Sequence, residues 1–65
     1  MKYSELPTGY KTERFGAMMR NLNNGETVNI RTLYLEEIKM LKALYGKELK
    51  QNGELLYRVP KEVVL

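Results

Sequence analysis

Apolar side chains recur with helical spacing in two stretches of the chain. The first stretch has Phe15, Met18, Met19 and Leu22 at i, i+3, i+4 and i+7. This spacing places them on one face of a helix. Thr12 can cap the N-terminus of that helix, and Asn23-Asn24-Gly25 tolerates the left-handed conformation common at helix C-termini. The pattern predicts a helix over residues 13–23.

The second stretch follows Thr32, a second candidate N-cap. Its expected inward stripe consists of Tyr34, Ile38, Leu41 and Tyr45, widened by Leu33, Met40 and Leu44. The sequence leaves the end of this helix open. Gly46 costs about 1 kcal/mol relative to alanine inside a helix and can end it, which gives a helix over 33–46. Because the stripe stays in phase through Leu49, we favour a helix that continues over 33–51.

The two ends of the second helix imply different roles for Asn52-Gly53. After a long helix this dipeptide is a C-cap. After a short helix it is a type I′ turn between strands 47–51 and 54–59, with Leu49 opposite Leu56, Glu48 opposite Tyr57 and Lys50 opposite Leu55.

The remaining segments predict a small sheet and an N-terminal arm. Residues 26–31 alternate polar and apolar, as in a short half-buried strand or a loop into the next helix. Leu55, Tyr57 and Val59 alternate like a strand with one buried face, up to Pro60. Residues 1–11 have no periodic pattern and read as an arm. The fold class is therefore α+β: one domain over 1–65 with two helices and a two- or three-stranded sheet.

Composition excludes several kinds of site. The chain has no Cys and no His, so it lacks disulfides, thiolate or imidazole metal ligands and the usual general base near neutral pH. All eight acidic residues are Glu, and they form no tight cluster. We expect a non-enzymatic protein without metal or cofactor. No apolar run reaches the 18 residues of a membrane span, which favours a cytoplasmic protein without a membrane partner.

Lysines are the main candidate for function. In a continuous second helix, Lys39, Lys47 and Lys50 lie within about 80° of one another, with Lys42 on the flank and small Ala43 between them. Such a face can lie along a phosphate backbone. It can equally be an ordinary solvated helix face.

The C-terminal part of the chain resembles a known family. Residues 52–63 read Asn-Gly-Glu-Leu-Leu-Tyr-Arg-Val-Pro-Lys-Glu-Val. This is similar to the wing end of excisionase-like and MerR-type small winged-helix DNA-binding proteins, which have a glycine-containing turn, a Tyr-Arg-Val/Ile-Pro strand and a short helix. The resemblance implies a winged-helix-like fold and a wing contact with phosphate or the minor groove through Arg58. The family has two short helices before the wing, where this chain has one long helix.

Two functions follow from these features. The first is a small DNA-binding accessory or transcription-regulating protein that contacts duplex DNA through Lys39, Lys42, Lys47, Lys50, Arg58 and Lys61. The second is an inhibitor or adaptor that occludes a partner protein, with an interface formed by Tyr3, Leu6, Tyr10, Val63, Val64 and Leu65. The lysines and Arg58 motivate the first function, which we favour, and the apolar C-terminal residues and the small core of a 65-residue chain motivate the second. A homodimer is compatible with both, and we expect the protein to form one.

Overall fold

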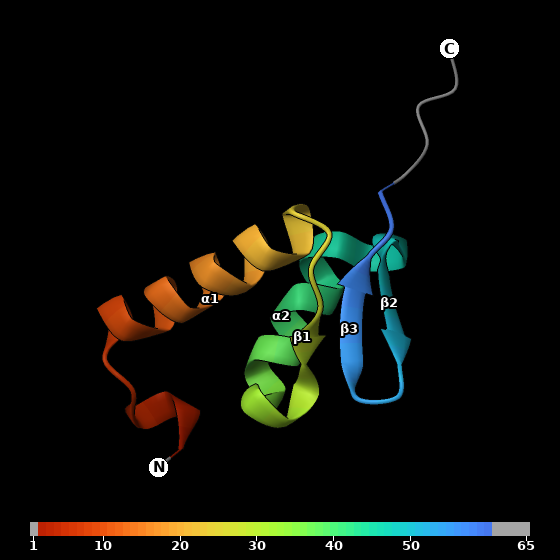
Figure 1. Ribbon diagram of the computed structural model, residues 1–65. Helices are drawn as coiled ribbons and strands as arrows, with labels where there is room; N and C mark the ends of the chain where they lie inside the picture. Colours follow the sequence, from red (N-terminus) through yellow and green to blue (C-terminus); the bar gives the residue numbers. More distant parts are fainter. Residues whose placement is uncertain (1, 61–65) are drawn as a thin grey trace.

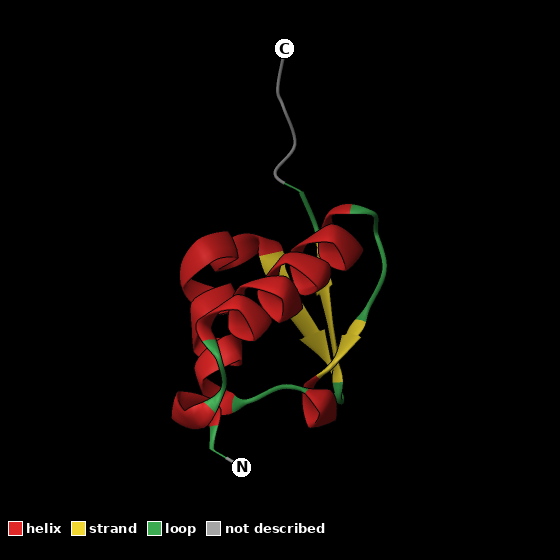
Figure 2. Cartoon of the chain, turned by 90° about the vertical axis from the view of Figure 1, so that its left-hand side faces the viewer, coloured by secondary structure: helices red, strands yellow, loops and turns green. Residues whose placement is uncertain are grey.

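Both helices cover the same face of a small antiparallel sheet (Figures 1 and 2). The structure is a computed structural model that describes residues 2–60. Its elements are α1 (Thr8–Asn23), β1 (Val28–Asn29), α2 (Leu35–Tyr45), β2 (Leu49–Asn52) and β3 (Leu55–Arg58), with three 3₁₀ turns, η1 (Tyr3–Glu5), η2 (Ile30–Thr32) and η3 (Gly46–Glu48). The strands are ordered β1-β3-β2, and every neighbouring pair is antiparallel. The predicted α+β class is confirmed.

One buried cluster joins the helices to the sheet. It consists of Met18 and Leu22 from α1, Val28 from β1, Leu41 from α2 and Leu56 from β3. Burying a leucine completely contributes roughly 2 kcal/mol, and Leu22, Leu41 and Leu56 are each at most 1% exposed. The predicted inward faces of both helices are therefore confirmed for Met18, Leu22 and Leu41, which are buried. At the edge of α2 the prediction is wrong, because Met40 and Leu44 are exposed.

Helix α1 begins five residues earlier than the sequence predicts. Pro7 lies before its first turn, and the carbonyl of Pro7 accepts a hydrogen bond from the Lys11 N–H (3.0 Å). Thr12 is consequently inside the helix, where its hydroxyl donates to the Thr8 carbonyl, and it is not the N-cap. The arm is therefore shorter than predicted. Its Leu6 is buried within the chain itself.

The first strand is shorter than the predicted 26–31. It pairs with β3 only through Val28 and Asn29, after which the Ile30 N–H donates to the Glu54 carbonyl (2.8 Å). The Asn29 side chain then accepts from the Arg31 N–H and bends the chain into η2. Thr32 is the last residue of η2, and α2 begins three residues later. The expectation that Thr32 caps this helix is wrong.

Gly46 ends the second helix. Its φ of 56° and ψ of −124° lie outside the helical region, in backbone space that favours glycine. Residues 49–52 form strand β2, so the continuous helix over 33–51 is wrong and the hairpin alternative is right.

The register of the hairpin differs by two residues from the predicted one. Leu49 lies opposite Arg58, and Gln51 lies opposite Leu56. The connecting residues are Gly53 and Glu54, in place of Asn52 and Gly53. This register brings Leu56 into the core, whereas Leu55 and Val59 are exposed. The expected buried face of β3 is therefore the outer face, away from the helices.

Candidate interaction surface

The four candidate lysines do not form one helical face. Lys39 and Lys42 lie on α2, Lys47 lies in η3 and Lys50 lies on β2. All four are exposed, and none forms an ion pair within the part of the chain that the structure describes. The predicted single basic face is wrong because Gly46 separates the first two lysines from the last two. Lys47 and Lys50 still meet, in the lining of one hollow.

Arg58 is occupied by contacts within the chain. Its guanidinium donates to the Glu48 carboxylate (Nε–Oε1 2.9 Å, Nη2–Oε1 2.8 Å) and to the Asn23 side-chain oxygen (3.0 Å). It also lies over the ring of Tyr45, 5.3 Å from the centroid. Because of these contacts the Arg58 side chain has a structural role, and its guanidinium is not free in the way that a phosphate-contacting wing arginine would be. Lys61 lies outside the described residues.

A buried ion pair connects α1 to the start of α2. Glu37 is completely buried, and its carboxylate receives two hydrogen bonds from Arg14 (2.8 and 2.9 Å) and one from the Tyr34 N–H (2.9 Å). Arg14 also donates to the Thr32 carbonyl (3.0 Å). Its guanidinium carbon lies 5.2 Å from the ring centroid of Tyr34 and 5.8 Å from that of Tyr10. One arginine therefore fixes the N-terminus of α2 against α1.

This environment shifts the pKa of both partners. Burial alone raises the pKa of Glu37, but the hydrogen bonds from Arg14 and from the Tyr34 N–H outweigh it and leave that pKa below its usual value. The Glu37 carboxylate raises the pKa of Arg14 above its already high value. Both groups are charged near neutral pH.

A pH dependence of stability follows from the lowered pKa of Glu37. A carboxyl whose pKa is lower in the folded state stabilises the fold above its unfolded pKa, about 4.3 for Glu, and loses this contribution as the pH falls through the folded value. We expect the free energy of unfolding from urea titrations to decrease below about pH 4.3. Glu37→Gln should flatten this decrease. An equal decrease in wild type and variant would contradict the role of Glu37.

Of the predicted interface residues, Tyr3 lies in η1 and Tyr10 in the first turn of α1, not in an arm, and both lie near this ion pair. The ring of Tyr3 packs against Tyr34 (centroids 5.5 Å apart), and its hydroxyl lies 3.7 Å from the sulfur of Met40. Tyr10 is 49% exposed. Tyr3 and buried Leu6 are therefore occupied within the chain, whereas Tyr10 is accessible. Val63, Val64 and Leu65 lie outside the described residues.

One hollow lies at the open end of the β2–β3 hairpin, where β2 begins and β3 ends. Its volume is about 390 Å³. Tyr45, Val59 and Pro60 contribute apolar surface to its lining, which also includes Lys47 and Lys50. Glu48 also lines this hollow, but Arg58 neutralises its charge. The lining of this hollow therefore combines apolar side chains with two free positive charges.

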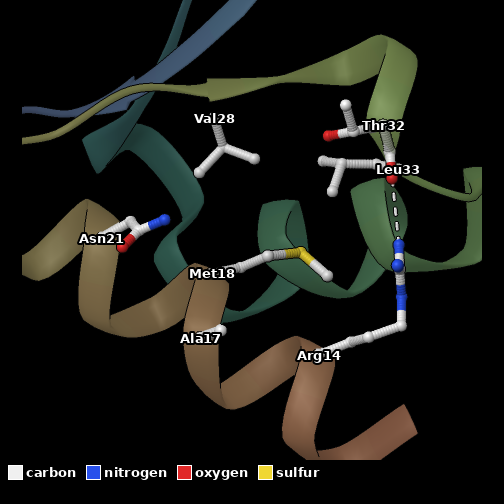
Figure 3. Close-up of a pocket in the computed structure, with 7 residues that line it drawn as sticks. All are labelled: Arg14, Ala17, Met18, Asn21, Val28, Thr32 and Leu33. Atoms are coloured by element: carbon white, nitrogen blue, oxygen red, sulfur yellow. Dashed lines mark hydrogen bonds between the residues drawn. The ribbon is translucent and has the colours of Figure 1, made fainter. Parts of the chain in front are cut away.

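A smaller hollow lies between α1 and the chain before α2 (Figure 3). Its volume is about 230 Å³, and Met18 and Val28 form its apolar part. Figure 3 shows Arg14 pointing along its edge to the Thr32 carbonyl. Since this arginine is already bonded to Glu37, the hollow offers no free charge to a ligand.

Within residues 2–60, no three His, Cys, Asp or Glu side chains are placed to hold a metal ion. None of the described helices is long and apolar enough to cross a membrane. The chain matches no family model, no curated protein and no solved structure.

Sequence reasoning missed Glu37 and Arg14. One signal for Glu37 was available, because a glutamate at the third helical position commonly accepts from the N-cap N–H. That signal depends on the true N-cap, Tyr34, and is lost when Thr32 is taken as the cap. Arg14 lies four residues before Met18, at the border of the inward stripe of α1.

Proposed function

We propose that the protein is a non-enzymatic interaction module that binds a partner protein through apolar side chains exposed among lysines. The observation that carries this proposal is the exposure of large apolar residues outside the core. Leu35 is 63% exposed, Leu44 55% and Val59 47%. Covering one such side chain contributes on the order of 1–2 kcal/mol to binding, and only an apolar surface can cover it.

The distribution of charge supports the same proposal. Arg14, Arg31 and Arg58 are all held in ion pairs within the chain. The available cations on α2, η3 and β2 are lysines; Lys39 and Lys42 lie on the same helix as Leu35 and Leu44, and Lys47 and Lys50 line one hollow with Val59. Mixed apolar and charged surfaces of this kind are typical of protein interfaces, in which apolar contacts supply affinity and charges select the partner.

Leu35 and Leu44 lie nine positions apart, on opposite sides of α2. We therefore expect Leu35→Ser combined with Leu44→Ser to reduce partner capture about fivefold or more whichever side the partner covers, because truncating the covered leucine removes roughly 1 kcal/mol or more of apolar burial. Wild-type and variant proteins would be immobilised, incubated with nuclease-treated cell extract and compared by quantitative mass spectrometry. Both leucines are exposed, so the fold should survive, as circular dichroism would check. Glu13→Gln, on the exposed surface of α1, is the matched control. The absence of any protein enriched on wild type over the double variant would contradict the proposal.

Binding to duplex DNA is a second candidate, favoured by two observations. Strand β3 and the turn before it lie within the segment 52–63 whose sequence resembles a wing, and helices α1 and α2 precede it along the chain. Lys39, Lys42, Lys47 and Lys50 are also free to neutralise phosphates. A regulatory or accessory role on DNA would then rest on these lysines, with Arg58 supporting the hairpin from within.

A salt titration separates the two candidates. Four phosphate contacts give a slope of about −3.6 in log affinity against log salt concentration. DNA binding therefore requires a complex at low salt that is lost steeply as salt increases. No gel shift at low salt, at tens of micromolar protein, would exclude this candidate.

A chain without cysteine has no need of an oxidising compartment, and we propose the cytoplasm as its location.

A further inference from the structure

Strand β2 has a free edge. It lies at the end of the β1-β3-β2 order, and within residues 2–60 no other strand pairs with its outer side (Figure 1). The Val59 N–H donates to the Glu48 carbonyl (2.8 Å). Because bonded pairs alternate along an antiparallel ladder, Lys50 and Asn52 also bond to β3. Leu49 and Gln51 therefore direct their backbone groups away from the sheet.

Three of these outward groups are available. The Leu49 N–H is already bonded to the Gly46 carbonyl. The Leu49 carbonyl and both backbone groups of Gln51 remain, and together they can form three hydrogen bonds with one added strand. Extended peptides commonly bind sheet edges in this way, with main-chain bonds supplying affinity and alternate side chains supplying specificity.

The side chains next to this edge define what the added strand must carry. A residue placed opposite Lys50 lies on the same outer face as the Lys50 ammonium group. On the same face of the added strand, the next side chain toward the Glu48 end of the edge lies two positions away. It lies toward the hollow that Tyr45, Val59 and Pro60 line. Lys47 adds a second free charge to the lining of this hollow. An acidic residue followed or preceded by an apolar residue two positions away matches both features.

A second copy of the chain is a poor match to the same edge. The antiparallel register that pairs Leu49 of one copy with Gln51 of the other places one Lys50 directly opposite the other. Like charges at such a position are destabilising. Lysine on an edge strand is a common protection against self-pairing. The same lysine is complementary to a carboxylate.

We propose that β2 binds an extended acidic segment of the partner protein, with a carboxylate opposite Lys50 and an apolar side chain in the adjacent hollow. This inference rests on the proposed protein-binding function and names the partner's chemistry.

The experiment uses the capped peptide Thr-Val-Thr-Glu-Thr-Val-Thr, which presents valine two positions from glutamate in either chain direction. Titration into ¹⁵N-labelled protein should shift the amides of β2, and the Gln51 amide should become protected from hydrogen exchange. The same peptide with lysine in place of glutamate should bind at least tenfold more weakly. Lys50→Glu should reverse this preference. Arg20→Glu, an exposed charge reversal on α1, should leave it unchanged.

Each outcome decides a specific point. Equal binding of the two peptides, or shifts confined to α2, would overturn the acidic-strand inference. If the leucine double variant still abolishes partner capture in that case, the protein-binding function stands. A Gln51 amide that is protected in the free protein at concentrations where sedimentation reports a dimer would assign the edge to a second copy and overturn the inference. If the wild-type protein neither binds the peptide nor captures any protein more strongly than the leucine double variant does, the proposed protein-binding function is overturned as well.

Discussion

Glu37→Leu is expected to lower the free energy of unfolding by about 3 kcal/mol. The substitution removes the carboxylate that Arg14 and the Tyr34 N–H share and leaves an apolar side chain in its place. Breaking a buried ion pair on one side costs about 3–5 kcal/mol. The lower end applies because the Arg14 side chain is 24% exposed and can recover some hydration. A domain of this length has a total stability of roughly 3–10 kcal/mol. Urea unfolding followed by circular dichroism at pH 7 would measure the loss.

The chain offers a matched control for this prediction. Arg31 and Glu54 form an ion pair of similar length (2.7 Å), but their side chains are 77% and 47% exposed. Glu54→Leu should therefore change the free energy of unfolding by less than about 1 kcal/mol. Combining Arg14→Met with Glu37→Leu should recover part of the loss, because no unpaired buried charge remains. Equal losses for Glu37→Leu and Glu54→Leu would show that the buried pair has no special role.

The helical cores could be predicted from sequence because their information is local. Met18, Leu22 and Leu41 repeat at helical spacing, and all three are buried. The start of α1 was not predictable in the same way. Gly9 and Thr12 are poor helix formers, yet residues 8–12 are helical. Burial of Leu6 before that turn depends on contacts that no sequence window contains.

The candidate site depended on long-range pairing, which explains the larger errors. Lys47 and Lys50 are in phase with Lys39 on an ideal helix, so periodicity alone favoured one basic face. The structure instead pairs Lys50 with Tyr57 across the hairpin. The contact of Arg58 with Asn23 spans 35 residues. Composition indicated that cations were present, but only the fold determines which of them remain free.

The decisive local residue is Gly46. A helix that continued to residue 51 would keep Leu49 on the inward stripe at a cost of about 1 kcal/mol for the glycine. The hairpin also buries part of Leu49, and it adds a strand that pairs along all of β3. The ladder hydrogen bonds therefore outweigh one and a half further helical turns, provided that residue 46 can adopt a positive φ.

Gly46→Ala is accordingly expected to lower the free energy of unfolding by about 2 kcal/mol. Nothing lies within 4 Å of an added Cβ, so the cost comes from the backbone conformation alone. Gly9→Ala is the matched control, since Gly9 lies in the first turn of α1 with equally open space. That substitution should stabilise the protein by about 0.5–1 kcal/mol, because alanine restricts the unfolded chain and favours the helix.

Urea unfolding and far-ultraviolet circular dichroism would distinguish the outcomes for these two variants. Opposite signs for the same chemical change would assign the effect at position 46 to its left-handed backbone. If Gly46→Ala instead raised both stability and helix content, the second helix would be able to continue into β2. Gly46 alone would then prevent the helical pattern from continuing through Leu49. The hairpin, the free edge beside Lys50 and the hollow at Val59 would all depend on this one residue.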